Sequence, residues 1–84
     1  MKLVMIEWRD AVGGTRAGWK PVADMTRDKP HQCRSVGWLV SETEERLVIV
    51  PHLTNDNDGD GELTIPKDWT QSIVELIERP KRKK

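Results

Sequence analysis

Two apolar runs separated by a short polar segment constrain this chain more than any other feature. Residues 33–53 read CRSVGWLVSETEERLVIVPHL. Both runs are apolar and the SETEER segment between them is polar, which predicts a β-hairpin with a polar turn. Apolar residues fall on both faces of the second run, as is typical of a central strand in a covered sheet. Gly37 would let another group approach the first run closely.

Three further segments have strand character: residues 2–9, 62–66 and 71–78. The last of these, QSIVELIE, fits a helix face by spacing, but its β-branched residues and its shortness favour a strand. Residues 10–18 contain three glycines, which predicts a loop, and residues 19–26 around Pro21 predict a short helical turn within the same connection.

Five short strands in this order predict a mainly β fold, namely a small five-stranded barrel of the Src-homology-3-like or Sm-like kind. A tight hairpin in the middle and a single turn (PKDW, residues 66–69) before the last strand fit that architecture. Closure would hide the sheet edges that so small a domain would otherwise expose. A three-stranded sheet followed by a C-terminal helix is the alternative.

The chain has 84 residues, enough for one small domain, which we assign to residues 1–78. Residues 79–84, RPKRKK, form a basic tail that is expected to be disordered. Without it, nine basic residues face 14 acidic ones, a net charge of −5 over residues 1–78. An acidic body is unlike the basic face of a dedicated DNA-binding protein. The tail itself suits either phosphate contacts or simple solubility.

Cys33 is the single cysteine, so an intrachain disulfide is excluded, which fits a reducing compartment. The N-terminal MKLVMIEWRD becomes charged too early for a signal peptide, and no apolar stretch approaches the length of a membrane span. The sequence therefore predicts a soluble intracellular protein with no membrane partner.

An acidic segment, NDNDGDG at residues 55–61, resembles the start of a calcium-binding EF-hand loop. With Asp56 at position one, the bidentate glutamate expected at position twelve is replaced by Lys67, and Pro66 precedes it. A lysine ammonium there would repel the cation. We therefore predict a solvated polar turn between two strands, and leave open weak cation binding.

Other chemistry is weakly supported. His31, Cys33 and His52 are ligand types for zinc, but their spacing matches no known finger and a second cysteine is missing, so we assign no metal site and no cofactor. The chain has no nucleophile elbow, phosphate-binding glycine loop or paired carboxylates, so we assign no catalytic residues and expect the protein not to be an enzyme.

Tryptophan is the only aromatic residue type, with four copies and no Phe or Tyr. Trp38 lies within an apolar run and is predicted to be in the core. Trp8, Trp19 and Trp69 are expected at a strand end, a loop and a turn, where they could form a recognition surface, because tryptophan buries a large flat area. Alternatively, all four fill the core. A small anionic ligand would need basic side chains, for which the candidates are Arg9, Arg16, Lys20 and Arg34.

Several segments together resemble a group of small proteins carried by bacteriophages and prophages: EWRDA (7–11), GW (18–19), CRSVGWLV (33–40), VIVPHL (48–53) and TIPKDW (64–69). The likeness spans most of residues 4–77, and the SVGWLV strand followed later by the Ile-Pro turn is its most specific part. The resemblance implies an accessory protein expressed in the cytoplasm of an infected bacterium, and it implies no catalytic residues.

We therefore expect a non-enzymatic phage accessory protein that binds a host component, most simply a host protein, and inhibits or redirects it, with counter-defence as one role. An acidic body would favour basic partners. Sequestration of a small anionic ligand is a variant of this expectation. The alternatives are a nucleic-acid-binding barrel and a virion or assembly component. Exposed sheet edges would also allow a homodimer.

Overall fold

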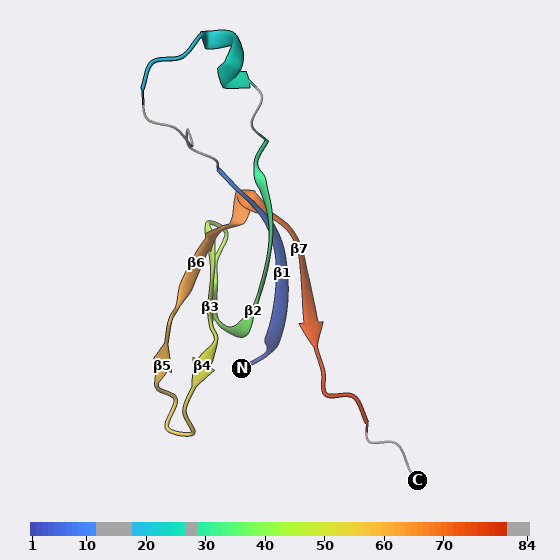
Figure 1. Cartoon of the computed structure of the whole chain (residues 1–84). Helices are drawn as coiled ribbons and strands as arrows, with labels where there is room; N and C mark the ends of the chain where they lie inside the picture. The colour runs from blue at the N-terminus through green and yellow to red at the C-terminus, as the bar shows by residue number, and fades with distance from the viewer. Residues whose placement is uncertain (12–17, 27–28, 81–84) are drawn as a thin grey trace.

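The computed structural model describes residues 1–11, 18–26 and 29–80, and most of them belong to β-strands (Figure 1). In chain order the elements are β1 (Leu3–Asp10), the 3₁₀ turn η1 (Val22–Thr26), β2 (His31–Glu42), β3 (Arg46–Val50), β4 (His52–Leu53), β5 (Gly59–Asp60), β6 (Leu63–Pro66), the 3₁₀ turn η2 (Lys67–Trp69) and β7 (Thr70–Leu76). The mainly β prediction is confirmed.

Five strands form one antiparallel sheet in the order β6-β3-β2-β1-β7. The first three strands follow one another as hairpins, and β6 adds to the free side of β3. At η2 the chain crosses to the other side of the sheet, where β7 pairs with β1. Among the described strands no pairing joins β6 to β7, so the closed barrel expected from the sequence is not formed and both strands remain sheet edges.

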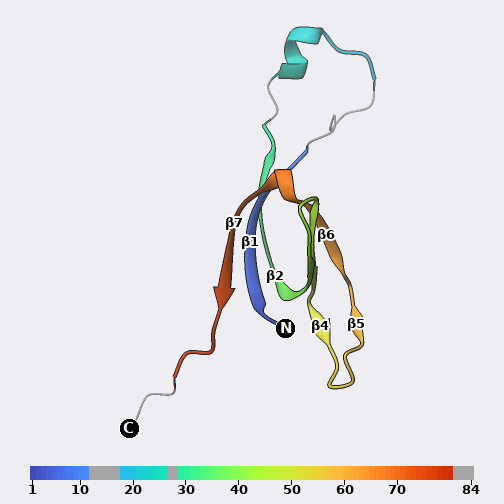
Figure 2. The same cartoon turned by 180° about the vertical axis from the view of Figure 1, so that it is seen from behind.

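The individual elements follow the sequence closely. The segment 71–78, for which helix and strand competed, is a strand over Thr70–Leu76. The helical turn expected at 19–26 is the 3₁₀ turn η1, and the polar turn of the central hairpin lies at residues 43–45. Residues 77–80 follow β7 without regular structure and lead away from the sheet in both views (Figures 1 and 2).

The core lies on one face of the sheet, called here the inner face. Alternate residues of β1, β3 and β6 point to it, as the two-residue period of a strand requires. The cluster of fully buried side chains consists of Val4, Ile6, Leu47, Ile49 and Ile65, with Trp8 and Leu39 packed against it. This core is small, in keeping with the length of the chain.

The opposite face, called here the outer face, carries a row of apolar residues across three strands. Met5 of β1 lies between Val36 of β2 and Val74 of β7 in the register of the sheet. Val36 and Val74 are 50% and 45% exposed. No described element covers this row.

Residues 55–58 of the acidic segment lie at the tip of a small hairpin, and the next two residues form β5, which pairs with β4. The backbone N–H of Thr54 donates to the carbonyl of Asp58 (2.8 Å), and the Thr54 hydroxyl accepts from the Asp58 N–H (3.0 Å). Asn57 has φ 65°, a left-handed conformation that asparagine tolerates well. The predicted polar turn is therefore confirmed.

The described residues 18–26 of the first connection, called here the arm, stand away from the sheet in both views (Figures 1 and 2). No residue of η1 is buried. The molecule is elongated, 60 Å along its longest axis, with a radius of gyration of 17.7 Å. A compact chain of this length would have a radius of gyration of about 12 Å. In the described part of the chain, no helix has the length and apolar character needed to cross a bilayer.

Candidate functional site

A groove of about 400 Å³ lies at the end of the sheet where β1 ends and β7 begins. We call it the η2 groove. It is lined by Arg9, Asp10 and Ala11 after and within β1, by Pro30 just before β2, and by Asp68, Trp69, Thr70 and Gln71 of η2 and β7. Segments far apart in the sequence therefore meet there.

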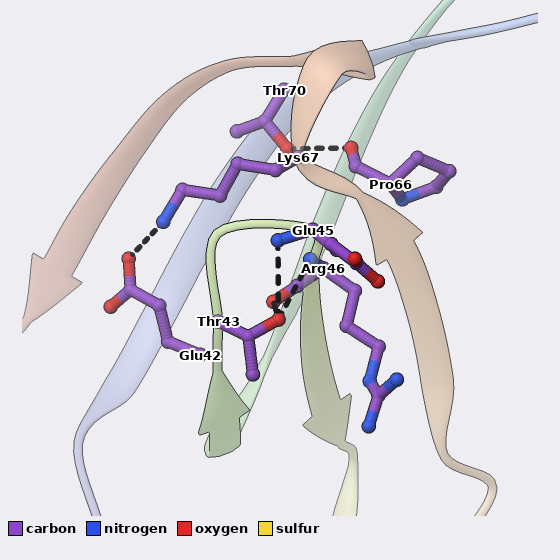
Figure 3. Close-up of polar contacts among 7 residues, drawn as sticks. All are labelled: Glu42, Thr43, Glu45, Arg46, Pro66, Lys67 and Thr70. Atoms are coloured by element: carbon purple, nitrogen blue, oxygen red, sulfur yellow. Dashed lines mark hydrogen bonds and ion pairs between the residues drawn. The ribbon is translucent and has the colours of Figure 1, made fainter.

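The turn η2, which presents Asp68 and Trp69, is fixed by its neighbours (Figure 3). Pro66 ends β6 and cannot donate to the sheet, and its carbonyl accepts a hydrogen bond from the Thr70 hydroxyl (3.2 Å). The backbone N–H of Lys67 donates to the carbonyl of Glu45 in the β2–β3 turn (2.8 Å). The Lys67 ammonium also pairs with the carboxylate of Glu42. These contacts join η2 to the central hairpin.

The β2–β3 turn that holds η2 has its own anchor. The hydroxyl of Thr43 accepts hydrogen bonds from the backbone N–H groups of Glu45 (3.2 Å) and Arg46 (3.1 Å), both visible in Figure 3. This side-chain cap fixes the carbonyl of Glu45 in the position where it receives the Lys67 N–H. The groove thus has a defined frame on the η2 side.

Arg9 is held back against the wall of the groove. With the Gln71 amide oriented to satisfy both of its groups, its oxygen accepts from Nε (2.9 Å) and Nη2 (3.1 Å) of Arg9, and its nitrogen donates to Oε1 of Gln32 (2.8 Å). Gln71 is the extra residue of a register irregularity, since Glu7 pairs with Ser72 and Trp8 with Thr70. The irregularity lets Gln71 reach Arg9.

The two acids of the groove are available to a ligand. Within the described ranges, the carboxylates of Asp10 and Asp68 form no ion pair or hydrogen bond. Trp69 beside them is 41% exposed. An indole next to two free carboxylates is suited to a guanidinium or an ammonium group, because the ring face attracts a cation and the carboxylates neutralise it.

The residues predicted as a binding surface lie in different places. Trp69 and Arg9 meet in the η2 groove. Trp8 packs on the core, and its Nε1–H donates to the hydroxyl of Ser35 (3.0 Å). Trp19 is fully exposed, and Lys20 follows it, half-buried, in the arm.

The two remaining basic candidates do not join this groove. Arg34 lies on the outer face, where its Nε is 3.8 Å from Oε1 of Glu7. Arg16 lies outside the described residues. The basic candidates that are described therefore do not converge on one pocket. Trp38, predicted to be in the core, is half-buried, so none of the four tryptophans is fully buried.

Sequence reasoning missed most of the groove. Asp68 is adjacent to Trp69 in the KDW turn, and Asp10 directly follows Arg9. Each acid therefore lies next to a residue that the sequence had suggested for binding. Gln71 and Pro30 gave no signal, because their roles depend on the register of β7 and on where β2 begins. The acid directly before the predicted turn tryptophan, Asp68 before Trp69, was the one clue available.

A second depression of about 450 Å³ lies at the β4–β5 hairpin, lined by Trp38, Pro51, His52, Leu53, Thr54, Asp58, Gly59 and Asp60. It also combines a tryptophan with acids. Its outer wall, however, is a hairpin whose two strands are two residues each, which is a less rigid support than the ends of the main sheet. In the part of the chain that is described, no three His, Cys, Asp or Glu side chains are grouped so that they could hold a metal ion.

Comparisons with protein-family models, with curated proteins and with solved structures find no match to this chain.

Proposed function

We propose that this protein is a non-enzymatic binding protein whose η2 groove takes a basic segment of another protein. The observation that carries the proposal is the half-exposed Trp69 lining the same groove as two carboxylates, Asp10 and Asp68, that have no partner within the described residues. A lysine or arginine of the partner stacks on Trp69 and is neutralised by the acids. The net charge of −5 over residues 1–78 steers such a partner toward the protein.

The sheet order supports a finer proposal for the fold, an open relative of the Src-homology-3-like barrel. The order β6-β3-β2-β1-β7, with a 3₁₀ turn before the last strand, is the one expected of that architecture. Such a sheet presents its binding residues on the connections between strands, which is where the η2 groove lies.

The resemblance to small phage proteins supports a biological role. We propose that the protein acts in the cytoplasm of an infected bacterium, where it masks a basic surface of a host protein and so blocks or redirects it. Nucleic-acid-binding proteins are suitable partners, because their functional surfaces are basic. A counter-defence role belongs to this proposal.

Peptide binding tests the groove directly. A short peptide rich in arginine and lysine is expected to bind, and an acidic peptide of the same length is not. The change Trp69→Ala is expected to weaken binding about tenfold, and Asp10→Asn and Asp68→Asn about threefold to fivefold each, measured by isothermal titration calorimetry. Added salt should weaken binding of the wild type.

Two matched variants serve as controls for position. Asp58→Asn removes the same charge at the β4–β5 depression, and Trp19→Ala removes an exposed tryptophan in the arm. Both should bind the peptide as the wild type does. Equal loss in Asp58→Asn and Asp68→Asn would show that net charge alone attracts the peptide and would contradict the proposal. Tight binding of labelled DNA or RNA at low salt, lost on removal of residues 79–84, would favour the nucleic-acid-binding alternative instead.

A further inference from the structure

β7 is the sheet edge with the least protection against pairing with another strand. The other edge, β6, has four residues and ends at Pro66, which has no N–H to donate. β7 has seven residues, TQSIVEL, with no proline, no lysine and one charged residue. Natural sheets usually cover or charge such an edge, and within the described residues nothing covers this one.

β7 carries exposed apolar side chains on both faces. Ile73 and Val74 are 38% and 45% exposed, and Ile77, just beyond the strand, is 84% exposed. Val74 is also the end of the outer-face row that runs through Met5 to Val36. That apolar row stops abruptly at the β7 edge.

We propose that a second copy of this chain pairs with β7, antiparallel and across a twofold axis, with Val74 of one copy opposite Val74 of the other. The two sheets then join into one, and the outer-face rows of both copies become continuous across the axis. The pairing uses the edge of β7 and needs no peptide in the η2 groove.

The register follows from the strand itself. The regular part of β7 runs from Ser72 to Leu76, because Gln71 is displaced at the irregularity opposite β1. A twofold pairing centred on Val74 uses all five of these residues. Shifting the centre of the pairing by one residue toward the C-terminus would place Glu75 of one copy opposite Glu75 of the other. Like charges directly opposite each other destabilise a sheet. Shifting the centre by one residue toward the N-terminus would require the displaced Gln71 to take part in the pairing.

Charge complementarity identifies the occupant as a second copy. Because the paired strands are antiparallel, residues 77–80 of one copy continue toward η2 of the other. That segment includes Arg79, and η2 includes Asp68, which forms no ion pair within the described residues. Each copy thereby brings a basic residue to an acid of the other, and the same contact occurs twice, as twofold symmetry requires.

Molar mass in solution tests the pairing. Sedimentation equilibrium over micromolar to submillimolar concentrations is expected to show a shift from 9.7 kDa to twice that mass. The change Val74→Lys places two ammonium groups opposite each other and is expected to raise the dissociation constant of the dimer at least about 100-fold. Val36→Lys makes the same change on the other side of Met5, away from the edge, and should alter that constant less than about threefold.

The two variants also separate edge pairing from stacking of the outer faces. Both valines are half-exposed, so both lysine variants are expected to remain folded, as circular dichroism will show. Equal loss of dimer in the two variants would mean that the outer faces stack, and would overturn the proposal. A wild-type protein that stays at 9.7 kDa at every concentration would overturn it as well.

Disulfide formation tests the register. In a Cys33→Ser background, Val74→Cys places two cysteines across the axis with Cα atoms about 4.5 to 5.5 Å apart, within disulfide range. Ile73→Cys faces Glu75 of the second copy instead, and its own counterpart lies more than about 7 Å away on the diagonal. Mild oxidation should therefore cross-link the first variant and not the second. Preferential cross-linking of Ile73→Cys would overturn the proposed register.

Discussion

A Cβ atom built onto Gly37 would lie 2.8 Å from the carbonyl oxygen of Val50 and 3.2 Å from the Cβ of Ile49. The first contact is with backbone, which cannot move without disturbing the pairing of β2 with β3. Gly37 is itself buried, so this close approach of β2 to β3 lies in the interior of the protein. The missing side chain is what allows the two strands to come together there.

We expect Gly37→Ala to lower the free energy of unfolding by about 2 kcal/mol, because the added methyl group overpacks a rigid site. Gly59→Ala is the matched control, since its Cβ would meet a side-chain methyl group of Val50 at 3.3 Å. That variant should cost less than about 1 kcal/mol. Urea unfolding measures both, with an unchanged dependence on denaturant. Equal costs would show that β2 and β3 can separate at Gly37 without penalty.

The four tryptophans illustrate what a residue type alone leaves open. Each has the same large apolar ring, yet Trp8 packs on the core and donates to Ser35, Trp19 is fully exposed, and Trp69 borders a groove. The sequence predicted that tryptophans would matter for contact. Which of them share a surface depends on strand order and register, and these arise only when distant segments pair.

At the scale of elements, the turn 43–45 has more influence than its length suggests. It closes the central hairpin, and the carbonyl of Glu45 accepts the Lys67 N–H that positions η2. The side chains of Lys67 and Glu42 are 33% and 46% exposed, so their ion pair adds little stability. The backbone hydrogen bond is therefore the stronger constraint.

Thr43→Ala is expected to lower the free energy of unfolding by about 0.5 to 1 kcal/mol, because two backbone N–H groups lose their acceptor at a solvent-exposed site. It should also weaken binding of the basic peptide about twofold, since η2 becomes less firmly held. Thr43→Ser keeps the hydroxyl and is the control. Thermal unfolding and calorimetric titration measure the two effects. A full loss in Thr43→Ser would assign the effect to the methyl group instead.

Elements were predicted well where the local pattern was strong. The central hairpin, the first strand, the β6 segment and the polar turn at 55–61 all form as expected, because alternation and turn residues act over short distances. The segment 71–78 needed tertiary information. Its local sequence is compatible with both a helix and a strand, and the hydrogen-bonded pairing with β1 selects the strand.

At the scale of the whole molecule, the sheet and the arm differ in how many side chains they bury. The sheet contains every fully buried side chain of the described chain, and η1 contains none. The arm carries exposed apolar residues, including Trp19, Val22 and Met25. Stability therefore resides in the sheet, and the arm can open or be cut at little cost.

Limited digestion with chymotrypsin should cleave first after Trp19, because an exposed segment with few contacts enters a protease site readily. The cleaved protein is expected to keep the circular dichroism and the unfolding midpoint of the sheet. Mass spectrometry identifies the first cut. Initial cleavage after Trp38 or Trp69, which belong to the sheet and to η2, would show that the sheet opens before the arm.

The sequence by itself determined the strands, the polar turns and the acidic character of the body, because each depends on neighbouring residues or on a simple sum of charges. It did not determine that the sheet stays open, since closure depends on whether β6 and β7 meet after the chain has crossed at η2. Nor did it bring Asp10, Asp68 and Trp69 to one groove. Those outcomes depend on contacts between segments up to some sixty residues apart in the sequence, and only pairing in three dimensions decides them.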